Sequence, residues 1–408
     1  MERTDERQMK GLEIAQNGGI RQMELNLYKV PAQFGSGAYV VNFGEHEPTC
    51  TCPDFETRHV KCKHQWAAEY YLKFERDKLG NMTVTQVKKV TYTQNWPAYN
   101  QAQTSEIELF DILLKDLVQS VEEPKQQIGR PKASERDLFF CAVQKVYSQL
   151  SSRRAYTLYK NAGSKKQIEK PPCYNMVNIL LNREDITPVL HELLKLSALP
   201  LKSVESQFAV DSSGFRTTKF DDYCREKHKV RKQHKWVKAH VMCGTKTNVI
   251  TSAEITGEYG ADCPQFERLV TATHESGFSL NEVSADKAYL SRDNLGLIEG
   301  LGGTPYIPFK EGSRGTRTRG GSPIWKRMYY LFRYQNDEFM AHYHRRSNVE
   351  TVFQMVKAKF GDKLKSKNWV AQQNELLCKL IAHNICVLIQ EMHELGIRPE
   401  FMSKTLTL

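Results

Sequence analysis

The sequence predicts an α/β protein whose largest domain holds a mixed β-sheet flanked by helices. The main observation is the order of apolar segments after about residue 206, which switch between the short period of strands and the longer period of helices. Three strands, a helix, a strand, a helix, a strand and a helix are expected there, an order typical of α/β folds. A helical pattern precedes this region. Near the N-terminus, a cluster of cysteine and histidine residues after short strand-like runs predicts a small metal-binding domain.

The composition is that of a globular protein. The chain has 408 residues, of which 40% are hydrophobic and 10% aromatic, so about two or three domains can form, the largest with a substantial core. It begins MERTDERQ without an apolar segment, and it holds no uncharged run of membrane-spanning length. We therefore expect a soluble, cytoplasmic protein that makes no contact with a membrane.

The cysteines are not arranged as a disulfide framework. Three of the ten lie in one short motif, and the others are scattered, several of them inside apolar runs. This distribution favours a reducing compartment and a metal site.

Basic residues outnumber acidic residues by 58 to 47, which gives a formal net charge of +11. The excess is clustered, because residues 216–238 contain nine Lys or Arg, residues 310–327 six and residues 357–367 five. Such segments indicate a polyanionic partner, most simply DNA. A solvated surface that only keeps the protein in solution is the alternative.

Changes in these patterns divide the chain into five parts. We expect a zinc-binding domain over residues 1–80, a connector over 81–128, a helical region suited to DNA binding over 129–205, the α/β domain over 206–395 and a tail over 396–408.

The first half of the chain is expected to hold short strands and several helices. The strand-like runs are MELNLYKV (residues 23–30) and AYVVNF (38–43). Ser134 is placed to cap a helix that runs to Leu150. Further helices are predicted over residues 64–78, 106–122, 174–182 and 187–196.

The second half is expected to alternate between strands and helices. The predicted strands cover residues 208–215, 234–245, 249–256, 281–289 and 304–309. The predicted helices cover residues 264–275, 292–301, 337–360 and 372–395.

Cys50-x-Cys52 and Cys62-x-His64 form two close pairs separated by nine residues. Three thiolates and one imidazole are ligands that suit tetrahedral Zn²⁺, and four protein ligands indicate a closed structural site. A chance grouping of cysteines near a histidine is the alternative. His59, inside the intervening segment, is a weaker candidate ligand.

Tyr343, Arg346, Glu350 and Lys357 are spaced to lie together on one helix, within an arc of about 60°. One carboxylate would then lie among two cations and a phenol. Such a polar ridge beside a buried face predicts a helix that lines a cleft. An exposed helix with an ordinary Arg346–Glu350 surface salt bridge is the alternative. The face expected to be buried consists of Val349, Val352, Phe353, Val356 and Phe360.

Asp211 and Asp286 each follow a short apolar strand. Catalytic groups of α/β sheets gather where strands end, although a lone aspartate there is often a turn former or a helix cap. Together with Glu350, these residues could hold two divalent ions about 3.5–4 Å apart, the arrangement that phosphodiester transfer requires. Mg²⁺ and Mn²⁺ prefer such oxygen ligands.

The spacing Tyr-x2-Arg-x3-Glu-x6-Lys is similar to the YREK signature of DDE transposases from a large group of bacterial and archaeal insertion sequences. The segments AVDSSGF and SADKAY resemble the strands that carry the two aspartates of this family. The resemblance covers about residues 129–395. Further matching positions are Lys238-x-His240, Asp262 and Ala382-His383-Asn384.

The resemblance implies a ribonuclease H-like fold and a catalytic centre that works with two Mg²⁺ or Mn²⁺ ions. It implies that the catalytic residues and ligands of these ions are Asp211, Asp286 and Glu350. It also implies that phosphates of the transposon end are contacted by Tyr343, Arg346 and Lys357.

The implied function is cut-and-paste transposition of an insertion sequence. Hydrolysis at the ends of the element would be followed by attack of the freed 3′-hydroxyl on a target phosphodiester. The implied partners are the terminal inverted repeats, the target DNA and a second copy of the chain in a homodimer, in the nucleoid of a prokaryotic cell. Two alternatives stay open: a transposase-derived DNA-binding protein without catalytic activity, and a ribonuclease H-like nuclease without strand transfer.

Some relatives carry, between the second aspartate and the glutamate, a tryptophan that receives a flipped base during hairpin formation. Trp325 is the only tryptophan in the corresponding interval, and it could serve this purpose or pack in the core. The 63 residues between Asp286 and Glu350 leave room for one short helix and a strand.

The order CxC…CxH resembles the SWIM zinc finger over residues 1–80, which implies a Zn²⁺ ion and contacts with DNA or protein. Gly129-Arg130-Pro131-Lys132 resembles a hook in which Arg130 follows the floor of the minor groove, although a linker turn is the alternative. The helices that follow would suit binding of transposon ends by a helix-turn-helix-like unit, or brace the catalytic domain as an ordinary bundle.

Overall fold

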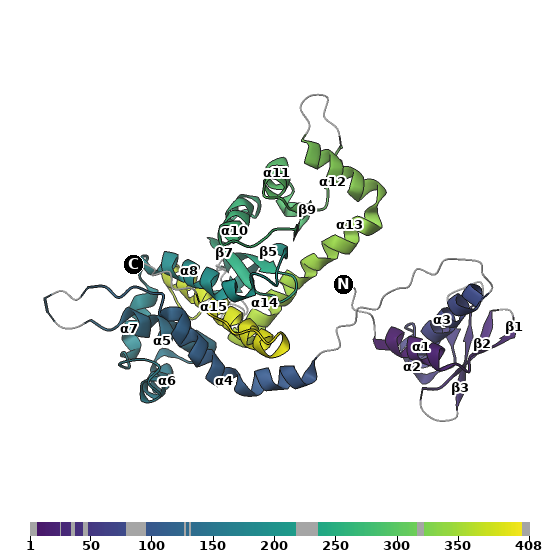
Figure 1. Cartoon of the computed structure of the whole chain (residues 1–408), viewed down its shortest axis with the longest axis horizontal. Coiled ribbons are helices and arrows are strands. Elements are labelled where there is room, and N and C mark those ends of the chain that lie inside the picture. Colours follow the sequence, from purple (N-terminus) through teal and green to yellow (C-terminus); the bar gives the residue numbers. More distant parts are fainter. Residues whose placement is uncertain are drawn as a thin grey trace, which may run out of the picture. The chain divides into compact units, whose positions relative to one another are not determined.

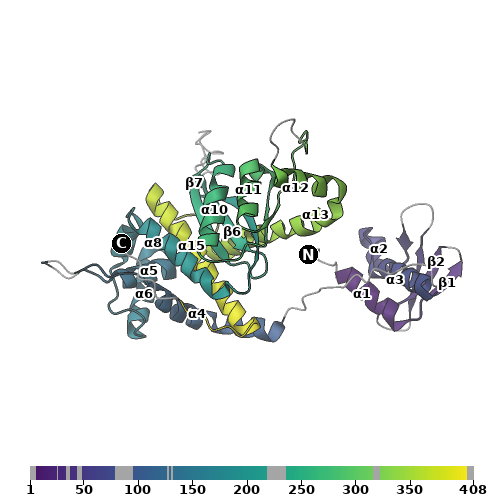
Figure 2. The same cartoon turned by 45° about the horizontal axis from the view of Figure 1, so that its top comes forward.

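The computed structural model describes residues 6–24, 26–33, 37–43, 48–78, 95–125, 128–129, 132–217, 236–315 and 322–401. The chain forms two compact units, Met1–Gln94 and Asn95–Leu408 (Figures 1 and 2). Each unit has its own cluster of buried apolar side chains. No helix within the described ranges has the length and apolar character needed to cross a membrane.

In its described part, the first unit contains a four-stranded antiparallel sheet. The strands lie in the order β1 (Arg21–Glu24), β2 (Leu27–Pro31), β3 (Ala38–Asn42) and β4 (Thr49–Cys50). The predicted strand over 23–30 is divided by a turn at Asn26, which has a positive φ of 66°. The helices of this unit are α1 (Glu6–Asn17), α2 (Pro53–Arg58) and α3 (Lys63–Lys78).

Helix α1 has no counterpart among the predicted elements, because its polar residues outnumber its apolar ones. Packing on α3 holds it in place. A Cβ atom on Gly11 would lie 2.5 Å from the Cβ atom of Trp66, so the two helices can approach this closely only with glycine at that position. Ile14 is buried together with Tyr28 and Val30 of the sheet.

The second unit begins with a helical layer that packs on its C-terminal helix, α15 (Trp369–Glu394). Helix α4 begins at Trp96, well before the predicted 106–122, with the side chain of Asn95 as its N-cap. Ser134 caps α5 as predicted, since its Oγ accepts the N–H of Asp137 at 3.2 Å. The helices of the layer are α4 (Trp96–Val118), α5 (Glu135–Tyr147), α6 (Ser152–Ser164), α7 (Tyr174–Leu181) and α8 (Ile186–Ala198).

The five-stranded sheet of this unit is mixed, as expected. Its order is β7-β6-β5-β8-β9, in which β5, β6 and β7 are antiparallel and β5, β8 and β9 are parallel. The predicted strands are therefore confirmed, with β8 and β9 shorter than predicted. Their bounds are β5 (Gln207–Arg216), β6 (Trp236–Gly244), β7 (Ile250–Gly257), β8 (Glu282–Ala285) and β9 (Thr304–Tyr306).

Helices cover both faces of the sheet (Figure 1). On one face, α10 (Cys263–Glu275) packs on β6 and β7, and α11 (Arg292–Gly300) lies beside it against β9. On the other face lie α8, α14 (Ser347–Phe360) and α15.

The predicted motif 382–384 anchors α15 to the sheet. The side chain of Asn384 accepts the N–H of Ile250 at 2.8 Å and donates to its carbonyl at 2.7 Å. The Nε2 atom of His383 lies 2.9 Å from the carbonyl oxygen of Asn248. These bonds hold the start of β7 in register with the helix.

The prediction of one continuous helix over 337–360 is wrong. The chain forms α13 (Asn336–Tyr343), a 3-10 turn (His344–Arg346) and then α14. The break follows from two packing demands. Phe339 of α13 packs on Tyr306 of β9, with ring centroids 5.6 Å apart, whereas α14 packs on β5. The 3-10 segment His344–Arg346 joins the two helices.

The buried face predicted for the second part of this segment is confirmed, because Val349, Val352, Phe353, Val356 and Phe360 are all buried in α14. The interval between Asp286 and Glu350 holds more helix than predicted, since α12 (Pro323–Tyr334) and α13 follow α11 and β9.

Candidate active site and metal centre

Asp211 and Asp286 lie on neighbouring parallel strands. Val210 of β5 pairs with Ala285 of β8, and each aspartate is the next residue along its chain. Paired strands lie about 4.8 Å apart, so the two aspartates start from adjacent positions at one edge of the pair. Asp286 also caps the short 3-10 helix after β8, because its Oδ1 accepts the N–H of Lys287 at 2.7 Å.

The guanidinium of Arg346 joins Asp211 to Glu350. Its Nη1 atom lies 2.5 Å from Oδ2 of Asp211, and its Nη2 atom lies 2.6 Å from Oε1 of Glu350. Arg346 and Asp211 are each 20% exposed at the side chain, whereas Glu350 is 54% exposed. The Tyr343 ring lies 5.9 Å from the guanidinium carbon, beside the same group.

Burial raises the pKa of the Asp211 carboxyl above its ordinary value. The N–H of Ser212, which bonds to Oδ1 at 2.8 Å, and the charge of Arg346 act against this rise, whereas Asp286 and Glu350 add to it. The influence of both acids on Asp211 places all three carboxylates in one electrostatic environment. Burial likewise raises the pKa of Tyr343.

Lys357 contacts the same strand, β5, at Ser213, two residues after Asp211. Its Nζ donates to Ser213 Oγ at 2.7 Å, and alternate residues of a strand point to the same face, so Ser213 and Asp211 share a face of β5. Burial lowers the pKa of Lys357. Two residues of the predicted ridge, Arg346 and Lys357, therefore contact β5, and Tyr343 and Glu350 lie beside Arg346.

The three carboxylates can accept hard divalent ions, but they are spread apart. Within the described residues, the one group of three or more His, Cys, Asp or Glu with ligand atoms within 4.8 Å of one another is Cys50, Cys52, Cys62 and His64. Between Asp211 and Glu350 lies the guanidinium of Arg346, a cation bound by oxygen atoms from both acids. Asp211 and Glu350 are therefore both bound to the guanidinium of Arg346 in this structure.

A second polar cluster contacts Ser212, the residue that follows Asp211. Oδ1 of Asp262 accepts from Lys238 at 2.6 Å and from the Ser212 hydroxyl at 2.8 Å, and it lies 3.1 Å from Nδ1 of His240. Because the N–H of Ser212 donates to Asp211, Asp262 holds the residue that orients the first acid. The sequence matches at 238, 240 and 262 singled out these residues, but not their contact with Ser212.

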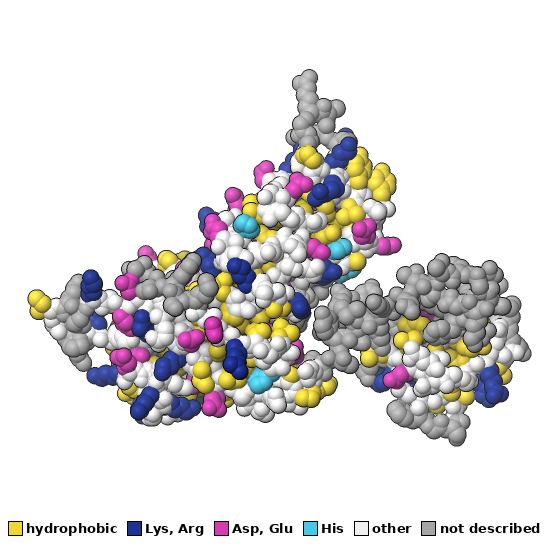
Figure 3. Space-filling view, in the orientation of Figure 1, with side chains coloured by type: hydrophobic (Ala, Val, Ile, Leu, Met, Phe, Trp, Pro, Cys, Tyr) yellow, Lys and Arg dark blue, Asp and Glu magenta, His cyan; other side chains and the backbone are white. Residues whose placement is uncertain are grey.

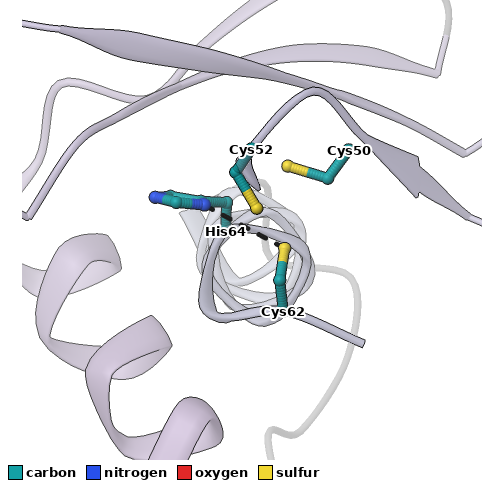
Figure 4. Close-up of side chains that lie close together, drawn as sticks. All are labelled: Cys50, Cys52, Cys62 and His64. Atoms are coloured by element: carbon teal, nitrogen blue, oxygen red, sulfur yellow. Dashed lines mark hydrogen bonds between the residues drawn. The ribbon is translucent and has the colours of Figure 1, made fainter. Parts of the chain in front are cut away.

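Cys50, Cys52, Cys62 and His64 come together as predicted (Figure 4). Strand β4 supplies Cys50, the turn before α2 supplies Cys52, the residue before α3 is Cys62, and the first turn of α3 supplies His64. All four are buried. Three thiols and one imidazole with converging ligand atoms fit tetrahedral Zn²⁺.

The surroundings of this cluster keep its ligands in place. The N–H of Cys62 donates to Gln65 Oε1 at 2.7 Å, and Gln65 in turn donates to the carbonyl of Pro48 at 2.5 Å. A hydrogen bond with Cys50 lowers the pKa of the Cys62 thiol to about 4. The ring of His64 lies against Tyr39, with centroids 4.5 Å apart. His59 lies outside the cluster, where it ends α2.

Two further predicted residues stand apart from these sites. Arg130 lies outside the described residues. The indole of Trp325 donates to the carbonyl of Arg314 at 2.9 Å and packs edge-on against Phe309, with centroids 4.9 Å apart. In this structure Trp325 therefore packs within the fold.

Two segments of the chain match known protein families. Residues 202–385 match the family described as Transposase DDE domain, and residues 39–73 match the SWIM zinc finger. These matches support a DDE transposase domain in the second unit and a SWIM zinc finger in the first. Among solved structures, it is similar to a cryo-EM structure of the piggyBac transposase synaptic complex with hairpin DNA, at 12% identity and a TM-score of 0.33, over 76% of this chain and 80% of that chain.

Proposed function

We propose that this protein is a DNA transposase of the YREK-signature group that moves an insertion sequence by a cut-and-paste route. The observation that carries the proposal is the link from Asp211 on β5 through Arg346 to Glu350 on α14, beside Asp286 on the neighbouring strand. The order of strands and helices around these residues supports a ribonuclease H-like fold.

In this proposal, the catalytic residues are Asp211, Asp286 and Glu350. They would hold two Mg²⁺ or Mn²⁺ ions, which when bound activate the attacking oxygen and stabilise the leaving oxygen of an in-line displacement. Each acid contributes hard carboxylate oxygens from a different element, so the site forms only when strand β5, strand β8 and helix α14 are packed together.

Arg346 would change partners during the reaction. Its fork of N–H groups suits a phosphate as well as a carboxylate. A DNA phosphate that takes the guanidinium would release Asp211 and Glu350, which are then free to bind metal ions. Tyr343 lies beside the guanidinium and Lys357 lies further along β5, so both are placed to contact phosphates of the transposon end.

The remaining parts of the proposal come from the resemblance to transposases. The DNA partners are the terminal inverted repeats and the target, and a homodimer joins two ends in the nucleoid of a prokaryotic cell. The SWIM unit with its Zn²⁺ ion would contact DNA or a protein of the transposition complex.

Incubation of the full chain with Mn²⁺ and labelled DNA that carries the repeats flanking its gene tests the function. Joined products support transposition, nicks without joining support a nuclease, and retarded but uncut DNA supports a binding protein. Asp211→Asn is the control, because it should abolish cutting and joining while DNA binding is kept. If Asp211→Asn cuts DNA normally, the assignment of the active site is wrong.

A further inference from the structure

A second feature of the transposase unit has no role in the site described above. A cavity of about 440 Å³ lies where the helical layer meets the loop between α14 and α15. We call it the lysine pocket, because Lys145, Lys365 and Lys367 line it and no carboxylate does so among the described residues. Its other polar lining includes Ser152, Asn178 and Asn182.

Lys145 brings a nearly buried positive charge to this pocket. It is 9% exposed, and its Nζ donates to Asn178 Oδ1 at 3.0 Å. Burial lowers the pKa of Lys145, and the nearby carboxylate of Glu375 acts against this. Both oxygens of Glu375 accept N–H groups of Lys365 and Ser366 at 2.7–3.0 Å. An ammonium can donate three hydrogen bonds, so Lys145 can still bind an anion. A buried cation favours such a partner strongly.

Two helices begin at the rim of the pocket. Helix α6 starts after Ser151, and helix α15, of 26 residues, starts after Asn368. In neither case does the side chain before the helix accept a hydrogen bond from it. The positive ends of both helix dipoles therefore add to the charge of the lysines.

The loop that forms one wall is held in a fixed shape. Lys379 donates to the carbonyls of Gly361 and Lys363 at 2.7 and 2.8 Å. Asn368 of the loop donates to Asn182 of the opposite wall at 2.8 Å. A pocket that is already formed loses little conformational entropy when it binds a ligand.

The same loop is attached to the strand of the active site. The N–H of Arg216, at the end of β5, donates to the carbonyl of Asp362 at 2.9 Å, and the N–H of Leu364 donates to the carbonyl of Arg216 at 2.8 Å. The loop that lines the pocket is therefore hydrogen-bonded to the end of the strand that carries Asp211.

Basic side chains are interspersed with acidic ones over the α5–α7 end of this unit (Figure 3).

From these observations we propose that the lysine pocket binds a backbone phosphate of duplex DNA engaged at the active site. The inference rests on the proposed function, and it names a contact outside the Tyr343–Lys357 segment. A phosphate fits the pocket because it accepts hydrogen bonds from ammonium, hydroxyl and helix N–H groups together. The contact is independent of base sequence.

The test measures binding of a fluorescein-labelled duplex of arbitrary sequence to the full chain by anisotropy, between 50 and 200 mM salt. All proteins carry Asp211→Asn to prevent cutting. Lys367→Gln should weaken binding roughly tenfold and reduce the slope of log K against log salt by about 0.9, the value for one lost phosphate contact. Lys145→Met should act in the same direction, and Lys367→Arg should restore the slope.

Lys202→Gln is the matched control, because Lys202 is an exposed lysine of the same unit that does not line the pocket. Thermal unfolding of each variant shows that it is folded. An unchanged slope in Lys367→Gln overturns the inference, as does an equal loss in Lys202→Gln. If the Asp211→Asn protein without further changes binds no duplex at all, the proposed function fails as well. If the wild type cuts DNA and the pocket variants bind it normally, the inference alone is overturned.

Discussion

The guanidinium of Arg346 lies 2.5 Å from the carboxylate of Asp211, although 135 residues separate them in the chain. The same guanidinium binds Glu350, so one side chain holds together the strand and the helix that supply two of the three proposed catalytic acids. Arg346 thus positions Asp211 and Glu350, and its guanidinium would have to leave before a metal ion could bind between them.

Replacing Arg346 with methionine should strengthen Mn²⁺ binding in the absence of DNA. The two carboxylates would lose a competing cation whose charge-assisted hydrogen bonds are each worth about 1.5–3 kcal/mol, so we expect a Kd that is lower by at least about tenfold. Titration calorimetry of the zinc-loaded full chain measures this.

Arg345→Met is the matched control for this variant, because the neighbouring Arg345 binds Glu282 at 2.5 Å instead. Its Mn²⁺ affinity should equal that of the wild type. Adding Asp211→Asn to Arg346→Met should remove the gain. Weaker Mn²⁺ binding by Arg346→Met would show that Arg346 does not compete with metal ions.

Asp262→Asn should slow DNA cutting while leaving DNA binding unchanged. Asp262 acts as a positioning residue, because it holds the Ser212 hydroxyl at 2.8 Å while the N–H of Ser212 holds Asp211. Loss of such outer contacts typically costs about 10–100-fold in metal affinity or activity. The Mn²⁺ concentration for half-maximal cutting should therefore rise in the variant.

The comparison for this prediction is Asp293→Asn, an exposed acid in the first turn of α11. It should leave both the rate and the Mn²⁺ requirement unchanged. A variant at Asp262 that cuts at the normal rate and needs the normal Mn²⁺ concentration would rule out the positioning role.

Cys62→Ser should release the zinc ion and unfold the first unit alone. Structural zinc supplies on the order of 10 kcal/mol of folding free energy in small zinc domains. A unit as small as this sheet with three helices does not stay folded without that contribution. Hydrogen exchange with mass spectrometry should show lost protection over residues 6–78 and unchanged protection over 132–217.

Cys173→Ser controls for the loss of a thiol, because Cys173 is exposed in the second unit. Its zinc content and its exchange pattern should match the wild type. Full protection of residues 6–78 in zinc-free Cys62→Ser would contradict the structural role of the metal.

Acid should destabilise the second unit through His383. Burial lowers the pKa of His383 to about 4 in the folded chain, against an ordinary value near 6.5. Between these values the unfolded chain binds a proton that the folded chain does not, so stability falls as the pH falls from about 6.5 to about 4. The loss is of order 3 kcal/mol at 1.36 kcal/mol per unit.

Thermal unfolding of the wild type and of His383→Asn over this pH range checks the sign. The variant should be less stable at pH 7, because it loses the bond to Asn248, but its Tm should depend less on pH. His274→Asn, at an exposed position of α10, should keep the pH dependence of the wild type. Parallel curves for all three proteins would exclude His383 as the titrating group.

Local patterns were sufficient for the zinc cluster and for most of the sheet. Cys50, Cys52, Cys62 and His64 could be grouped from spacing, because metal ligands in close pairs leave few alternative arrangements. The strands β5 to β9 could be predicted because short apolar runs bounded by turns reflect the conformation that the backbone adopts locally.

The helix over 337–360 could not be predicted correctly, because its break depends on where Phe339 and the apolar face of α14 find partners in β9 and β5. Helical spacing does group Arg346 with Tyr343 and Glu350, as the sequence predicted. The contacts of Arg346 with Asp211 and of Lys357 with Ser213 on β5 come only from the folded chain.

The sequence by itself determined which side chains carry the chemistry, since residue type and spacing select thiolates for zinc and carboxylates for hard cations. The tertiary structure alone decided how they are held: Arg346 between Asp211 and Glu350, Asp262 behind Ser212, and the lysine pocket beside the α14–α15 loop. The physical reason is that periodicity records the local backbone, whereas contacts between residues far apart in the chain depend on packing among elements that no local pattern specifies.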